Sequence, residues 1–75
     1  MIFLMHYDRA RGRIVELREF AEDERSVAED ARLQLEFALG RQKVEHEVVL
    51  LEAASEDALR KTHRRYFENL EQLST

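Results

Sequence analysis

A run of apolar residues close to the N-terminus, residues 2–7, dominates the hydrophobic pattern of the chain. Five of its six side chains are strongly apolar and none is charged. Because both sets of alternate positions are apolar, the run predicts a central β-strand that is buried on both faces. We therefore expect the rest of the fold to assemble around this strand.

A second strand is predicted over residues 14–20, after a short polar loop. Asp8 can accept backbone hydrogen bonds at the start of the loop, and Gly12 can supply the positive φ of a turn that closes with a bulge. The two strands are thus expected to form a β-hairpin with residues 9–12 as its loop. The register then pairs Tyr7 with Ile14, His6 with Val15 and Leu4 with Leu17.

The pattern becomes helical from about Asp23 and continues to Leu39, with Gly40 as a signal for the end of the helix. Asp23 is the preferred N-cap, and Ser26, which opens a capping box, is the alternative. Acidic residues in the first turn suit the positive end of the helix dipole. A first helix is therefore expected directly after the hairpin.

A third strand is predicted over residues 43–52, and a last helix follows with Ser55 as its N-cap. The strand alternates between apolar and polar residues in its first half and is continuously apolar in its second half. The helix has apolar residues three and four positions apart, which is the clearest helical pattern in the chain. These positions are Leu59, His63, Tyr66, Leu70 and Leu73.

The order of these elements is ββαβα, and residues 1–75 contain no proline and no linker, so a single α+β domain is expected. A right-handed crossover through the first helix makes the third strand parallel to the second, and the most apolar strand belongs in the middle of the sheet. The predicted sheet therefore has three strands in the order 2-1-3 and is mostly antiparallel. Both helices are expected to cover one face, which gives two layers.

The opposite face of this sheet would remain open in a monomer. Its apolar side chains are Phe3, Met5, Tyr7, Ile14, Phe20, Val49 and Leu51. A patch of this size is larger than small monomers usually expose, and a second copy of the same face is its simplest cover. We therefore predict a homodimer that joins two sheets through these residues and serves as a small, non-catalytic protein–protein interaction module.

The charge balance disfavours nucleic acids and membrane surfaces as partners. The chain has 12 Lys and Arg against 16 Asp and Glu, a net charge of −4, whereas general nucleic-acid and membrane-surface binders are usually basic. The first residues lack the cationic segment of a leader peptide, and no apolar run is long enough to span a bilayer. A cytoplasmic location without a membrane partner is therefore expected.

The residues that catalysis usually requires are scarce. With no cysteine and two glycines, the chain offers no thiol nucleophile and no phosphate-binding glycine loop. The predicted register puts His6 and His46 on the face that should meet His63, but no helix carries the spacing of a two-histidine metal site. We therefore predict no catalytic site, no cofactor and no metal, with each histidine at the margin of the core.

A small RNA- or DNA-binding domain is the alternative function. Two basic clusters, in the hairpin loop and the last helix, could contact phosphates while Phe3, Tyr7 and Phe20 stack on bases. The cationic residues are Arg9, Arg11, Arg13, Arg60, Lys61, Arg64 and Arg65. The acidic first helix offers the cations of the last helix an internal partner instead, and Glu45 and Glu47 on the open face would repel a phosphate backbone.

Overall fold

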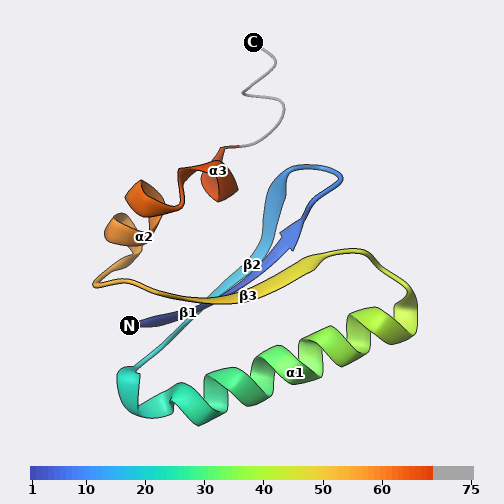
Figure 1. The fold of residues 1–75 in the computed structure, drawn as a ribbon, viewed down its shortest axis with the longest axis horizontal. Coiled ribbons are helices and arrows are strands. Elements are labelled where there is room, and N and C mark those ends of the chain that lie inside the picture. The colour runs from blue at the N-terminus through green and yellow to red at the C-terminus, as the bar shows by residue number, and fades with distance from the viewer. Residues whose placement is uncertain (69–75) are drawn as a thin grey trace.

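A computed structural model describes residues 1–68 and confirms the α+β class and the 2-1-3 strand order (Figure 1). The central strand β1 is antiparallel to both of its neighbours. The elements are β1 (Ile2–Asp8), β2 (Arg13–Phe20), the 3₁₀ turn η1 (Glu22–Glu24), α1 (Arg25–Gln42), β3 (Glu47–Glu52), α2 (Glu56–Thr62) and α3 (Arg64–Phe67).

The hairpin forms where the turn residues predict it. Gly12 has a φ of 65°, and its N–H donates to the Asp8 carbonyl at 2.8 Å. The Asp8 carboxylate accepts from the backbone N–H groups of Ala10 and Arg11 at 3.1 and 3.2 Å. These bonds hold the loop as a side-chain-mediated turn, and the predicted pairing of Tyr7 with Ile14 is confirmed.

A β-bulge changes the register one residue further along the hairpin. His6 pairs with Glu16 and Leu4 pairs with Arg18, so the pairs predicted for these two residues are wrong. Val15 is the extra residue at this irregularity. Because side chains alternate along a strand, the extra residue turns the rest of β2 to the opposite face of the sheet from the one predicted.

The two faces of the sheet are covered by different helices. On one face, α1 packs through Ala28 on a core of Ile2, Leu4 and Phe20. On the other face, the Tyr66 ring of α3 meets the Tyr7 ring edge-on at 4.9 Å between centroids. Figure 1 shows α1 on one side of the sheet and α2 with α3 on the other. The molecule therefore has three layers, and the prediction that both helices share one face is wrong.

The three-layer arrangement follows from the composition of β1. Ile2, Leu4, Phe3 and Met5 are all buried, and they point alternately to the two faces. A single helical layer would leave Phe3 and Met5 in water, so the chain places helices on both sides of the strand.

The helix ends differ from those predicted. α1 continues through Gly40, and Lys43 adopts the left-handed conformation (φ 56°) at its C-terminal end. The N–H of Val44 donates to the Leu39 carbonyl, as in a Schellman motif. At the other end, neither Asp23 nor Ser26 is the N-cap, because η1 precedes α1 and Glu24 occupies the N-cap position, without a side-chain hydrogen bond to the helix.

The third strand and the last helix are both shorter than predicted. β3 begins at Glu47 rather than at residue 43. The last helix is broken at His63 into α2 and α3. Ser55 is confirmed as the N-cap of α2, since its Oγ accepts from the Ala58 N–H at 3.1 Å. Leu70 and Leu73 lie outside the described residues.

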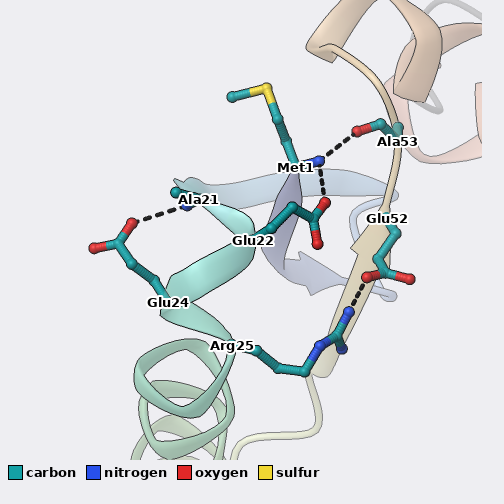
Figure 2. Close-up of polar contacts among 7 residues, drawn as sticks. All are labelled: Met1, Ala21, Glu22, Glu24, Arg25, Glu52 and Ala53. Atoms are coloured by element: carbon teal, nitrogen blue, oxygen red, sulfur yellow. Dashed lines mark hydrogen bonds and ion pairs between the residues drawn. The ribbon is translucent and has the colours of Figure 1, made fainter.

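A polar network ties the start of α1 to the end of β3 (Figure 2). The Met1 amine donates to the Glu22 carboxylate at 2.6 Å and to the Ala53 carbonyl at 3.0 Å. Arg25, the first residue of α1, pairs with Glu52, the last residue of β3. Since the end of α1 leads into the start of β3, the helix and the strand lie antiparallel with Arg25 beside Glu52.

Candidate functional site

The residues predicted to form a dimer interface do not form an open surface. Phe3 and Met5 have exposed fractions of 1% and 0% within one chain, because α2 and α3 cover their face. Phe20 is 6% exposed and lies on the opposite face, against α1, because the bulge inverts that part of β2. The open sheet face predicted from the sequence therefore does not exist, although dimerisation itself stays a prediction.

The other four predicted interface residues lie on the face of α2 and α3 and are partly buried. Tyr7 packs on Tyr66, and the remaining three retain some exposure on the two outer strands. They are Ile14, Val49 and Leu51. These exposed parts lie along the two outer strands, so the sheet exposes apolar surface at its edges rather than on a face.

The edge formed by β2 carries the features that natural proteins use to prevent strand pairing. Charged side chains occupy Arg13, Glu16, Arg18 and Glu19 and all four are exposed. The bulge at Val15 adds a local twist. Charged residues and bulges on an outer strand both discourage the addition of a further strand.

The edge formed by β3 has none of these features. Its four central residues, Val48 to Leu51, are all apolar and all partly exposed, and their pairing with β1 is regular. The charges lie only at the two ends of the strand and both are engaged within the chain. Glu47 accepts from the Tyr66 hydroxyl at 3.1 Å, and Glu52 pairs with Arg25. A regular apolar edge of this kind is a typical site for strand addition.

The shape of the molecule makes this edge prominent. The principal-axis extents are 41 × 33 × 12 Å, and Figure 1 is viewed along the shortest axis. Three strands about 4.8 Å apart account for most of a 12 Å thickness. Each broad side of the molecule therefore contains one edge strand and the flanks of the helices that cover the sheet.

The two flanks of α1 differ. α1 packs mainly on β3 and β1 and meets β2 at Phe20. Beside this contact a groove between α1 and β2 includes Val27, Asp30 and Arg18. The flank beside β3 begins with Arg25 and continues every three or four residues, as the helical repeat requires. Its residues are Arg25, Glu29, Arg32 and Glu36. Positive and negative side chains thus alternate along the helix flank that borders the β3 edge.

Two of the three histidines lie together. His6 Nε2 and His46 Nδ1 are 2.7 Å apart, and His46 Nε2 lies 3.6 Å from the Asp8 carboxylate. Burial lowers the pKa of His6 below its usual value, and the neighbouring His46 lowers it further, while Glu16 and Asp8 oppose this shift. These two nitrogens can share one hydrogen in an N–H···N bond. If both nitrogens carried a hydrogen, two N–H groups would face each other across 2.7 Å, which is unfavourable.

His63 lies apart from this pair, with its ring 6.3 Å from that of Tyr66 on the other face. The predicted meeting of all three histidines is therefore wrong. Within residues 1–68, no group of three histidine, cysteine or acidic side chains is arranged to hold a metal ion.

The basic clusters proposed for nucleic acid make contacts within the chain. Arg60 pairs with Glu56 and lies over the Phe67 ring, and Arg64 pairs with Glu68 at 3.6 Å. Arg65 donates to the Tyr66 hydroxyl at 2.9 Å. Phe3 and Phe20 are buried and cannot stack on bases as the structure stands.

The remaining residues of that alternative lie at the surface. Arg11 pairs with Asp8 at 3.6 Å, while Arg9, Arg13 and Lys61 are exposed. The geometry gives nucleic-acid binding no added support, and it stays a prediction.

One surface feature was not predicted, an apolar patch on the side of α1 that faces away from the sheet. Leu33 and Phe37 are one turn apart and are 58% and 70% exposed. Ala28, Ala31 and Leu39 occupy the opposite, sheet-facing side. Two apolar stripes on one helix are the sequence signal that could have identified this feature.

No protein-family model, curated protein or solved structure matches this chain. Among residues 1–68, no helix combines the length and the apolar character that crossing a membrane requires.

Proposed function

We propose that the chain is a small, non-catalytic protein–protein interaction module that binds its partner by adding a strand at the β3 edge. The observation that carries this proposal is the contrast between a charged, bulged β2 edge and a regular, apolar β3 edge. An outer strand leaves a row of backbone N–H and C=O groups without partners in the sheet, and an added strand satisfies them.

Side chains support the same mode of binding. Val48 and Leu50 point to the α1 face and Val49 and Leu51 to the other, so an added strand would find apolar neighbours on both faces. Cross-strand apolar pairs are the usual source of stability between strands, on top of the backbone hydrogen bonds. The acidic residues Glu47 and Glu52 lie at the ends of the strand, where they do not interrupt these pairs.

Peptide binding tests the proposal directly. A synthetic peptide of residues 46–53 is the probe, and a scrambled peptide of the same composition is the control. We expect the probe to perturb the amide resonances of Val48 to Leu51 and to slow their hydrogen exchange, with a Kd in the micromolar to millimolar range. Equal effects of both peptides, or effects confined to β2, would contradict strand addition at β3.

The expected cytoplasmic location also stays a prediction. Fractionation of cells that produce the tagged chain tests it, and recovery in the membrane or secreted fraction would contradict it.

A further inference from the structure

We infer that the strand added at the β3 edge comes from a second copy of this chain, so that two three-stranded sheets join into one six-stranded sheet about a two-fold axis. This inference rests on the proposed function and specifies its partner. It replaces the face-to-face dimer expected from the sequence, because α2 and α3 already cover that face.

The position of α1 favours a second copy over an unrelated strand. α1 lies over β1 and β3, so its axis is set back from the β3 edge by about half a strand spacing. With about 4.8 Å between strands, two copies paired through β3 would place their α1 helices about 10 Å apart. Packed helices lie 8–10 Å apart, and therefore the helices would meet as the strands pair.

One two-fold axis can serve the strands and the helices together. Arg25 lies beside Glu52, and α1 and β3 run in opposite directions. The middle of β3 is about 8 Å from Glu52 at the rise of a strand. Residues 30 and 31 of α1 are also about 8 Å from Arg25 at the rise of a helix. An axis through the middle of β3 therefore passes close to the same level of α1.

The charges on the helix flank match across this axis. In antiparallel helices related by a two-fold between residues 30 and 31, Arg25 of one copy faces Glu36 of the other, and Glu29 faces Arg32. Each of these two ion pairs occurs twice. Within one chain Arg32 pairs with Glu36 at 3.2 Å and Arg25 pairs with Glu52, while Glu29 is exposed. Across the axis each of these two arginines would gain a second carboxylate. The flank is thus self-complementary in a way that a charge-free or uniformly acidic partner could not match.

The register of the strands is restricted by the same symmetry. A two-fold axis perpendicular to the sheet keeps each side chain on its own face. Residues that lie opposite each other in the two copies of β3 must therefore point to the same face of the sheet. The two registers near the middle of β3 that meet this condition are centred on Val49 and on Leu50. Both place apolar residues opposite each other at the axis, and neither pairs Glu47 with Glu52 of the other copy.

The side of the molecule that contains β3 is broad enough to hold an interface of standard size. The broad side that contains β3 measures 41 × 33 Å, whereas a standard interface buries about 800 Å² on each partner. On the α2 and α3 side, α3 packs on β2 and contacts β3 at Glu47 through the Tyr66 hydroxyl, while Val48 to Leu51 stay partly exposed.

Sedimentation velocity of the full chain between 1 and 100 µM, with matched variants, tests this inference. We expect a dimer for the wild type and a rise in the dimer Kd of at least about tenfold for Val49→Lys. Val15→Lys, which puts the same charge on the exposed β2 edge, is the control and should dimerise like the wild type. Amide spectra of each variant establish that the monomer fold is retained.

A charge-exchange series tests the helix contact without any change in β3. Glu29→Arg sets like charges against Arg32 of the other copy and is expected to weaken the dimer by about tenfold. The double variant Glu29→Arg with Arg32→Glu restores opposite charges and should recover most of the lost affinity. If the double variant is as weak as the single one, the proposed helix pairing is wrong.

The outcomes separate this inference from the proposed function. A monomeric wild type at 100 µM that still binds the peptide of residues 46–53 would overturn the homodimer and retain strand addition to another protein. A monomer that does not bind the peptide would overturn both. A dimer that is insensitive to Val49→Lys would place self-association elsewhere and overturn this inference, and peptide binding would then decide separately whether strand addition at β3 is retained.

Discussion

The two outer strands of this sheet meet water in different ways. β2 exposes charged side chains along its length, contains a bulge and is anchored by one buried residue at its end, Phe20. β3 is regular, carries no charge in its centre and is partly buried from Glu47 to Leu51. The difference shows that only one edge is protected against a further strand, and it makes β3 the side on which a partner is expected.

The largest expected effect comes from Phe20, the buried residue of β2. Because β2 depends on one buried anchor, Phe20→Ala is expected to lower the free energy of unfolding by about 3–5 kcal/mol. Phe37→Ala is the matched control, since the same side chain is 70% exposed there, and it should change stability by less than about 0.5 kcal/mol. Urea unfolding of both variants gives the values, and similar losses would contradict the assignment of Phe20 to the core.

Removing the charges from β2 should make its edge resemble that of β3. With Arg18→Val and Glu19→Val together, both faces of β2 gain an apolar residue next to the edge, and self-association beyond the dimer is expected below 100 µM. Arg18→Gln with Glu19→Gln is the control, because it removes charge but keeps the edge polar. Sedimentation velocity distinguishes them, and no added association in the valine variant would mean that charge is not what protects β2.

The histidine pair, which lies near the start of β3, should make the free energy of unfolding depend on pH. The pKa of His6 is lowered in the folded state, so the folded chain binds a proton at this site less readily than the unfolded chain. Its contribution to the free energy of unfolding is therefore fully present above the ordinary histidine pKa of about 6.5. It is lost as the pH falls below that value, because the unfolded chain then binds a proton that the folded chain does not.

His46→Gln should weaken this pH dependence. The repulsion between His46 and a protonated His6 is removed, so the pKa of His6 should move part of the way back toward its ordinary value, while the lowering caused by burial remains. Thermal unfolding from pH 7.5 to pH 5, with the imidazole resonances followed in parallel, measures both effects. An unchanged pKa of His6 in this variant would show that the 2.7 Å contact does not persist in solution.

The connection from α1 to β3 gives the smallest expected effect. Lys43 adopts a positive φ that favours glycine, so Lys43→Gly should raise the free energy of unfolding by about 0.5–1 kcal/mol. Lys43→Ala keeps a β-carbon in the same conformation and is the control that should show no such gain. A destabilised glycine variant would mean that the lysine side chain contributes more than its backbone strain costs.

Local residue patterns were sufficient for the elements and their order. The apolar run at residues 2–7 identifies the central strand because it leaves no polar face, and Asp8 with Gly12 identifies the hairpin because their turn chemistry is specific. The strand order then follows from chain connectivity and from the burial of the most apolar strand. Ser55 was identifiable as an N-cap because the bond that it makes is local.

The faces of the elements were decided only by the tertiary structure. A bulge at Val15 inverts the second half of β2, and nothing in the alternation of that strand distinguishes the two registers. The candidate site is therefore the β3 edge rather than an open sheet face, because α2 and α3, which are distant in the sequence, cover the face that carries Phe3 and Met5. Alternation along a strand determines which residues share a face, whereas which face meets which helix depends on how the whole chain can bury both sides of β1 together.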